Sequence, residues 1–315
     1  LIKLRYMKKI NTLILGGNGL VGRTLSNNLQ NSDKVREVIA STREDANLFS
    51  LEETRDLIKR IQPDLIINAA AKVGGIQANN TQRTEFIIEN LKINMNLFEA
   101  VIDFPSTHII NLGSSCIYPL DAPNPISENS FLSGSLEPTN SPYAMAKITG
   151  IEIGRSVMKQ YGTKVTNLMP TNLYGPFDKF SELYSHVIPG LIHRMHTAKV
   201  NGESEFLIWG TGEPLREFLY SEDLAEAIEF IIDKDFEDDL LNIGSGEEIK
   251  IKDLSMLIKE IIDYDGKVLF DTSKPDGNPR KLLDSSRIKS LGWNSKTKLS
   301  DGLSKTYEWY LSNII

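Results

Sequence analysis

The sequence predicts an α/β protein with a doubly wound parallel sheet and a second, smaller, discontinuous α/β lobe. Through the first half of the chain, short apolar runs rich in branched residues alternate with amphipathic stretches, which is typical of parallel strands joined by crossover helices. The first of these runs leads directly into a cluster of glycines. After residue 172 the order of elements becomes less regular, and this change predicts the second lobe.

The first predicted strand, residues 10–15, ends at a turn that contains Gly16, Gly19 and Gly22. Gly16 permits a tight turn, Gly19 lets the backbone approach a pyrophosphate, and Gly22 allows the next helix to pack closely. A strand, a glycine turn and an amphipathic helix in this order indicate a Rossmann-type dinucleotide site, with the helix N-terminus facing the phosphates.

The end of the second strand, residues 37–40, bears on the choice of cofactor. Arg43 follows it, where an acidic residue would bind a ribose 2′-hydroxyl. Because a guanidinium attracts a 2′-phosphate, we expect NADP rather than NAD. A surface ion pair of Arg43 with Glu44 or Asp45 is the alternative.

The remaining elements continue the alternation. The third strand, residues 64–71, ends in small side chains, and we expect Ala70 to leave room for a cofactor. Ser221, which two acidic residues follow, is the expected N-cap of a late helix. The other predicted elements are strands at 108–112, 164–169 and 240–244, helices at 84–102, 141–161 and 221–232, and a terminal helix with its core face at Leu299, Leu303, Tyr307 and Leu311.

Composition argues against several classes of protein. A chain of 315 residues with 40% hydrophobic and 24% charged residues is typical of a globular protein with two domains. The net charge of −7 argues against nucleic-acid binding, and no apolar run approaches the length of a membrane span. One cysteine fits a reducing compartment, and residues 1–9 lack the apolar stretch of a signal peptide. We therefore expect a cytoplasmic protein.

Hydroxyls, the single thiol and a Tyr/Lys pair gather between residues 113 and 147. In a helix, Tyr143 and Lys147 lie one turn apart on the same face, so the ammonium can favour the ionised phenol. Such a phenol can donate a proton near neutral pH. Ser114 or Ser115, which follow an apolar run, can hold a substrate oxygen against it.

Further motifs extend this pattern over nearly the whole chain from Met7 on. They lie at residues 69–76, 113–119, 137–140, 170–176, 185–189, 209–212, 216–218, 274–277 and 279–281. With these motifs the chain resembles the extended short-chain dehydrogenase/reductases, and within them the 3,5-epimerase-4-reductases of GDP-4-keto-6-deoxy-D-mannose.

The resemblance implies a homodimeric enzyme that uses NADPH to epimerise C3 and C5 of a GDP-sugar and to reduce C4, giving GDP-L-fucose. We expect residues 1–172 and 216–246 to form the NADP-binding domain and residues 173–215 and 247–315 to bind the nucleotide sugar. By resemblance, the reductase triad consists of Ser114, Tyr143 and Lys147, of which Tyr143 and Lys147 also contact the cofactor. The resemblance makes Cys116 and His186 the acid/base pair of the epimerase. It also implies substrate contacts by Ser115, Asn172, Arg194, Trp209, Arg216 and Lys281.

Structural roles are the alternatives for three of these features. Cys116 alone would be a small buried hydrophobe, and Arg216 would form an ion pair with Glu213 or Glu217. His193 and His196 are spaced like metal ligands, but no third ligand of suitable spacing accompanies them, and we expect no metal.

The chain departs from its relatives in the loop that borders the sugar. Lys179 stands where family members usually have Asn, and Phe177 is also unusual. These residues leave open a GDP-heptose substrate, or 4-keto reduction without epimerisation. A nucleotide-sugar 4-epimerase with tightly held NAD and an NADP-binding sensor without turnover are weaker rivals, because Arg43 argues against the first and the Tyr143/Lys147 pair against the second.

Overall fold

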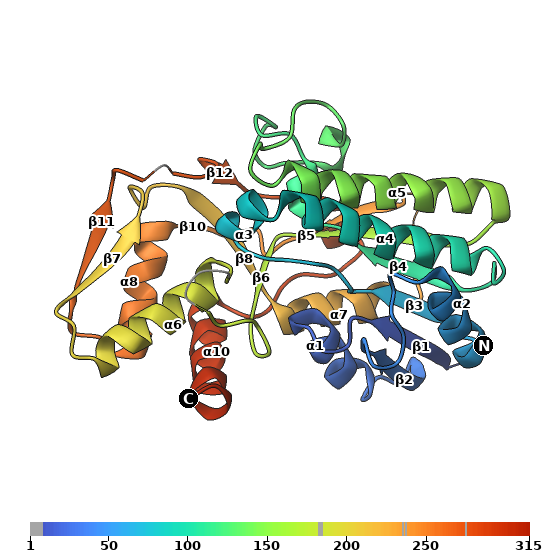
Figure 1. Ribbon diagram of the computed structural model, residues 1–315, viewed down its shortest axis with the longest axis horizontal. Helices are drawn as coiled ribbons and strands as arrows, with labels where there is room; N and C mark the ends of the chain where they lie inside the picture. Colours follow the sequence, from blue (N-terminus) through green and yellow to red (C-terminus); the bar gives the residue numbers. More distant parts are fainter. Residues whose placement is uncertain (1–8, 182–184, 235, 237, 275) are drawn as a thin grey trace.

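The computed structural model describes residues 9–181, 185–234, 236, 238–274 and 276–315. Figure 1 shows two parts, with the larger sheet and its helices on the right and the smaller lobe on the left. Among the described residues, no helix combines the length and the apolar character needed to cross a membrane.

The larger part is built on six parallel strands in the order β2-β1-β3-β4-β5-β9. The strands are rich in branched and aliphatic residues and, apart from β2, almost entirely buried, as expected when helices cover both faces of a sheet. Their bounds are β1 Ile10–Leu15, β2 Val35–Ser41, β3 Leu65–Asn68, β4 His108–Leu112, β5 Val165–Pro170 and β9 Leu240–Ile243.

Helices cover both faces of this sheet, which confirms the predicted doubly wound fold. On one face α4 packs between α2 and α5, and on the other α1 packs against α7 (Figure 1). Their apolar faces form two separate cores with the strands. The bounds are α1 Leu20–Leu29, α2 Leu51–Ile61, α4 Arg83–Val101, α5 Ser141–Tyr161 and α7 Ser221–Ile231.

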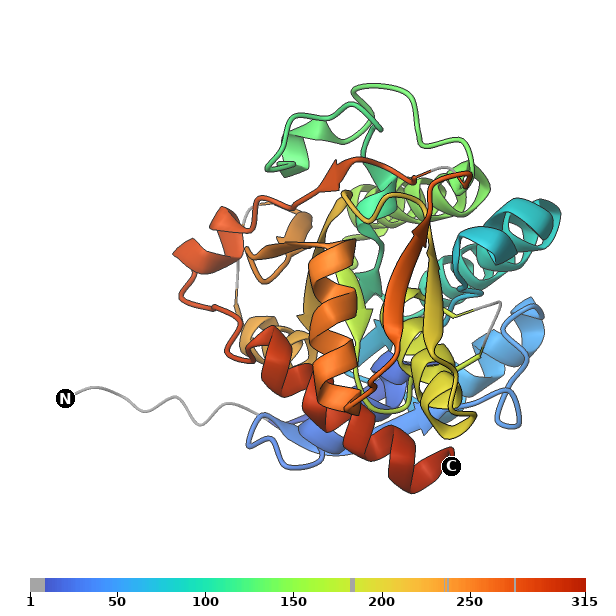
Figure 2. The same cartoon turned by 90° about the vertical axis from the view of Figure 1, so that its left-hand side faces the viewer.

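The smaller lobe holds two further sheets. In one, β8 (Leu215–Tyr220) pairs with β6 (Asn172–Tyr174), β10 (Glu248–Lys250) and β12 (Arg280–Lys281). In the other, β7 (Glu205–Trp209) pairs in parallel with β11 (Lys267–Asp271). Figure 2 shows α8 and α10 in front of these strands. The helices are α6 Val187–Val200, α8 Ile251–Ile262 and α10 Leu299–Asn313, with the short helices α3 Ile76–Thr81 and α9 Ser286–Ser290 elsewhere in the chain.

A row of buried asparagines crosses the centre of the large sheet. Asn68 on β3 donates to Asn111 Oδ1 on β4 at 3.0 Å, and Asn111 donates to Asn167 Oδ1 on β5, also at 3.0 Å. Asn167 in turn donates to Asp239 Oδ2 at 3.1 Å. The three asparagines are register partners on adjacent strands, so their amides link neighbouring strands inside the core.

Two local predictions are wrong. Ser221 is the first residue of α7 rather than its N-cap, which is Tyr220; the Ser221 hydroxyl is buried and accepts a hydrogen bond from Thr24 on α1 at 3.2 Å. Leu311 does not belong to the core face of α10, because 41% of its surface is exposed while Tyr310 is fully buried.

Candidate active site

The glycine turn between β1 and α1 fits a dinucleotide. Gly16 has a φ of +84°, and a Cβ there would lie 2.8 Å from Ala70 Cα. A Cβ at Gly22 would collide with the carbonyl oxygen of Gly16. A Cβ at Gly19, the N-cap of α1, would meet nothing nearer than 3.6 Å, so space for a phosphate remains over the helix N-terminus.

Arg43 lies at the end of β2 with its side chain exposed. In the part of the chain that the structure describes, it forms no ion pair with Glu44 or Asp45. Asp45 Oδ2 instead accepts hydrogen bonds from the backbone and the hydroxyl of Thr42, at 2.8 and 3.0 Å. The guanidinium therefore fits the 2′-phosphate of NADP.

Lys147 and Tyr143 lie one turn apart on α5. The Lys147 ammonium is buried and donates a 2.7 Å hydrogen bond to the carbonyl of Leu112, the last residue of β4. It also lies 5.7 Å from the centroid of the Tyr143 ring. Phe86 packs edge-on against the other side of that ring at 6.2 Å. The helix and the end of β4 thus fix both side chains.

Burial sets the proton affinities of this pair. It lowers the pKa of Lys147 to about 8, and it raises the pKa of Tyr143, to which the nearby Cys116 thiol adds. The net shift is opposite to our expectation, because desolvation of the phenol outweighs any stabilisation of its ionised form by the Lys147 ammonium, which is hydrogen-bonded to the Leu112 carbonyl. Tyr143 is therefore a protonated donor at neutral pH.

The thiol lies within the same constellation. Ser114 caps a single 3₁₀ turn, Ser115–Ile117, and its Oγ accepts from the Cys116 backbone N–H at 3.3 Å. Ser115 is buried in that turn. Burial raises the pKa of Cys116, while the charge of Lys281, a hydrogen bond with Ser114 and the charge of Lys147 oppose the rise. The structure therefore brings the thiol together with the triad and with Lys281.

His186 is the N-cap residue of α6. The residue is exposed, and desolvation by the surrounding protein lowers its pKa. Among the described residues, no hydrogen bond links His186 to Cys116.

Arg216 and Lys281 are register partners on the parallel strands β8 and β12. Burial lowers the pKa of both groups, and the Arg216 charge lowers that of Lys281 further. The alternative of an ion pair with Glu213 is wrong, because that carboxylate binds Lys250 and Lys252. Two adjacent, partly desolvated cations could hold an anion such as a diphosphate.

The other predicted substrate contacts are more peripheral or already engaged. Trp209, at the end of β7, is 57% exposed, with the Lys274 ammonium 5.9 Å from its ring. Arg194 stacks on Phe206 at 5.1 Å. Asn172 donates its amide N–H to the carbonyl of Glu217 at 2.8 Å.

The two histidines spaced like metal ligands are held by tyrosines. His193 Nδ1 lies 2.9 Å from the Tyr310 hydroxyl, and His196 Nδ1 lies 2.9 Å from the Tyr307 hydroxyl. Both contacts join α6 to α10, so in this structure the pair serves helix packing.

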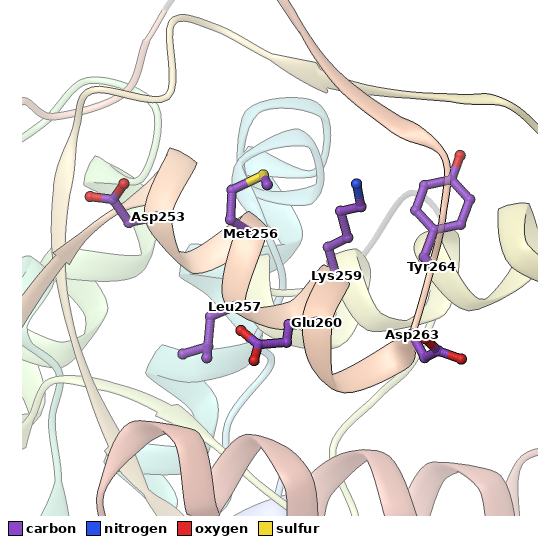
Figure 3. Close-up of a pocket in the computed structure, with 7 residues that line it drawn as sticks. All are labelled: Asp253, Met256, Leu257, Lys259, Glu260, Asp263 and Tyr264. Carbon is purple, nitrogen blue, oxygen red and sulfur yellow. The ribbon is translucent and has the colours of Figure 1, made fainter.

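An open hollow of about 560 Å³ lies along α8, away from all of these residues. Figure 3 shows that Met256, Lys259, Glu260 and Tyr264 spread along the helix without converging on a point. A binding site needs convergent polar groups, and this surface lacks them among the side chains that line it.

The sequence pattern does not show two contributors to the site. The Leu112 carbonyl that holds Lys147 is a backbone atom, so no residue type marks it. The proximity of Lys281 to Cys116, which the thiol's pKa reflects, joins segments far apart in the chain. The one available signal is the end of the predicted strand at Leu112, two residues before Ser114, because a strand end places a backbone carbonyl near that serine.

Comparisons with known proteins identify the family of the chain. The model of the NAD dependent epimerase/dehydratase family matches residues 12–244. The chain is 45% identical to GDP-L-fucose synthase 1 of Arabidopsis thaliana, over 98% of this chain and 95% of the relative.

Two solved structures are similar over nearly the whole chain. The NADP-bound GDP-L-fucose synthetase of Naegleria fowleri has a TM-score of 0.88 at 27% identity, covering 96% of this chain and 94% of that one. A GDP-6-OMe-4-keto-L-xylo-heptose reductase from C. jejuni has a TM-score of 0.88 at 30% identity, covering 96% of this chain and 98% of that one. The chain therefore belongs to the NAD dependent epimerase/dehydratase family.

Proposed function

We propose that this chain is an NADPH-dependent GDP-L-fucose synthase, which converts GDP-4-keto-6-deoxy-D-mannose to GDP-L-fucose. The observation that carries the proposal is the thiol of Cys116 in one constellation with Tyr143 and Lys147. A reductase needs the last two residues alone, whereas a thiol beside them serves proton transfer at carbon. The 45% identity to a GDP-L-fucose synthase over 98% of the chain supports the same substrate.

Epimerisation begins at the 4-keto group, which acidifies the hydrogens at C3 and C5. In our proposal Cys116 and His186 are the acid/base pair: one removes the proton, and the other returns a proton to the opposite face. Ser114 and Tyr143 donate hydrogen bonds to the oxygen on which negative charge develops. Ser115 supports the turn that presents the thiol.

Reduction follows at C4. Bound NADPH supplies the hydride for this carbon, and the glycine turn, Ala70 and Arg43 are the residues that would hold it. Tyr143 gives its proton to the C4 oxygen, and Ser114 orients that oxygen. The Lys147 ammonium, fixed on the Leu112 carbonyl, stabilises the phenolate that remains and contacts the cofactor.

The nucleotide sugar would lie between the two parts of the molecule. We assign its diphosphate to Arg216 and Lys281 because they are adjacent cations on paired strands. Trp209 and Arg194 lie farther out and suit the nucleotide, while Asn172 lies nearer the sugar. In this division residues 1–172 and 216–246 form the NADP-binding domain and residues 173–215 and 247–315 form the nucleotide-sugar-binding domain, with Arg216, at the boundary between them, reaching the substrate from β8.

We also propose a cytoplasmic homodimer. The outer faces of α4 and α5 expose Ile88, Met95 and Met145, with 45%, 51% and 45% of their surfaces accessible, and such apolar groups favour association. A cytoplasmic location keeps the Cys116 thiol reduced. Light scattering of wild type and Met95→Glu tests the dimer: a monomeric wild type would refute it.

A GDP-heptose is the second candidate substrate. The observations in its favour are the structural similarity to the heptose reductase and the presence of Lys179 in the loop before His186. That reductase shares 30% of its residues with this chain, whereas the Arabidopsis GDP-L-fucose synthase shares 45%. We therefore place the 6-deoxyhexose first.

One experiment tests the function and its rivals. Purified protein is mixed with NADPH and GDP-4-keto-6-deoxy-D-mannose in deuterated water, and the product is analysed by NMR. NADPH consumption with deuterium at C3 and C5 of GDP-L-fucose is the expected result. Consumption without deuterium would remove the epimerase role of Cys116 and His186. No consumption with this sugar, together with turnover of the 4-keto-heptose, would replace the substrate.

A further inference from the structure

Glu217 is a buried carboxylate outside the machinery described so far. It lies on β8 directly after Arg216, and none of its surface is exposed. No described residue forms an ion pair with it, and burial raises its pKa. The charge of Lys289 opposes the rise in pKa but is the smallest contribution to the shift, and a buried carboxylate is costly unless hydrogen bonds satisfy it, so its contacts need an explanation.

Two backbone N–H groups from distant segments satisfy the carboxylate. Gly246, in the turn between β9 and β10, donates to Oε1 at 2.7 Å, and Leu283, just after β12, donates to Oε2 at 3.0 Å. Gly246 has a φ of +81°, which favours glycine. A Cβ at Gly244 would collide with Oε1. The turn is therefore shaped around this side chain.

The backbone carbonyl of Glu217 binds a third segment. It accepts hydrogen bonds from the Thr171 hydroxyl at 3.2 Å and from the Asn172 amide at 2.8 Å. These residues join β5 of the large sheet to β6 of the smaller lobe. Glu217 thus connects the end of the large sheet, the turn after β9 and the segment that carries Lys281.

The two cations Arg216 and Lys281 depend on this connection. They are register partners on β8 and β12; burial is the main cause of the lowered pKa of Lys281, and repulsion by the like charge of Arg216 lowers it further. Successive side chains on a strand point to opposite faces, so Glu217 acts from the face behind Arg216. Its bond to Leu283, two residues after Lys281, holds β12 against β8 despite that repulsion.

Building on the proposed function, we propose that Glu217 is a positioning residue: its carboxylate clamps β12 and the β9–β10 turn to β8, and so holds Arg216 and Lys281 in register for the substrate diphosphate. Glu217 itself touches neither substrate nor reacting atoms. The clamp serves anion binding, so its loss should affect affinity for the nucleotide much more than the chemical steps.

Glu217→Gln tests the clamp with a side chain of the same size. An amide retains one acceptor, so one of the two backbone N–H groups would face an N–H donor. We expect the KM for the GDP-sugar to rise about tenfold, with kcat within about threefold of wild type and the KM for NADPH unchanged. The Kd of GDP, measured by calorimetry, should rise by a similar factor.

A second variant and a control keep the test independent of folding. Gly244→Ala leaves Glu217 in place but displaces its carboxylate, and should raise the same KM and Kd. Glu248→Gln is the matched control: Glu248 is the register partner of Glu217 on β10, and its partly exposed side chain pairs with Arg280. It should change both constants by less than about twofold. Circular dichroism and thermal unfolding check that each variant folds.

The outcomes separate this proposal from the proposed function. Equal effects of Glu217→Gln and Glu248→Gln on GDP binding, or a fall in kcat without a change in KM, would overturn the clamp. Because GDP binding needs no turnover, it tests the clamp even if the wild type fails to convert the 4-keto sugar. That failure alone would overturn the proposed function.

Discussion

The Lys147 ammonium is tied to the Leu112 carbonyl by a 2.7 Å hydrogen bond, so the side chain on α5 is fastened to the last residue of β4. Ser114 lies two residues farther along the chain. The bond thus sets the position of the triad lysine relative to the triad serine before any ligand binds. Catalytic groups held in this way lose little freedom in the reaction.

Replacing Lys147 should abolish reduction. In Lys147→Met the phenolate of Tyr143 loses its nearby charge, and the Leu112 carbonyl loses its donor. We expect kcat for NADPH oxidation to fall at least about a hundredfold. Lys159→Met, on an exposed position in the last turn of the same helix, should leave kcat near wild type. A Lys147→Met enzyme of normal activity would contradict the assigned role.

As the pH rises through the pKa of Lys147, activity should fall, whereas the contribution of this residue to the free energy of unfolding should rise. Its folded pKa is about 8, against an ordinary value of 10.5, so the rate of reduction should fall as the pH rises through about 8. Between these two values the unfolded chain holds a proton that the folded chain has lost, so this residue's contribution to the free energy of unfolding rises with pH. Rate profiles and urea unfolding of wild type and Lys147→Met isolate the contribution.

Cys116→Ser should separate the two half reactions. Serine has nearly the same volume but a hydroxyl that is far harder to ionise than a thiol. We expect deuterium exchange at C3 and C5 to slow by at least about a hundredfold, while hydride transfer to unepimerised sugar persists. NMR in deuterated water measures both. Exchange at the wild-type rate would remove the thiol from the mechanism.

Arg43 should determine the preference for NADPH. In Arg43→Ala the 2′-phosphate loses a charged partner, so the KM for NADPH should rise about tenfold or more while that for NADH stays unchanged. Arg36→Ala is the matched control, because Arg36 is an exposed arginine on β2, the strand that ends two residues before Arg43, and its side chain binds Asn11. If the two variants behaved alike, the cofactor preference would lie elsewhere.

A substitution at Tyr118 should affect the stability of the fold and not the catalytic chemistry. Its hydroxyl donates a 2.6 Å hydrogen bond to Asn242 Oδ1 in the core. Tyr118→Phe leaves that acceptor without its donor, so the free energy of unfolding should fall by about 1–3 kcal/mol. Tyr161→Phe, at an exposed tyrosine, should change it by less than about 0.5 kcal/mol. Urea denaturation compares the two.

Sequence alone predicts the six strands of the large sheet and most of its helices from local signals, but it gives no prediction for α2 (Leu51–Ile61). The glycine turn and the helix with Tyr143 and Lys147 are examples of such signals. Predictions from local patterns were wrong where tertiary contacts determine the role of a side chain. Ser221 has the chemistry of an N-cap residue, but its hydroxyl accepts a hydrogen bond from Thr24 instead. The direction of the Tyr143 pKa shift failed for a similar reason, since burial of the ring follows from packing.

The functional residues divide in the same way. The motif around Arg216 is visible in the sequence, whereas its position in strand β8 is not predicted from it. The role of Glu217 is not, because its carboxylate binds Gly246 and Leu283, which are 29 and 66 residues away. Two adjacent charged residues such as Arg216 and Glu217 usually indicate a surface ion pair. Only the fold shows that the Glu217 side chain is buried.

The buried amides of Asn68, Asn111 and Asn167 give the central strands a single alignment. If β4 moved by one residue against its neighbours, these amides would face aliphatic side chains with their donors and acceptors unmatched. Slipped pairings are therefore poor competitors during folding. Only Gly113 separates β4 from Ser114, and Lys147 is fastened to the end of the same strand. The hydrogen-bonded amides at the centre of the sheet therefore also fix where the catalytic serine and lysine stand.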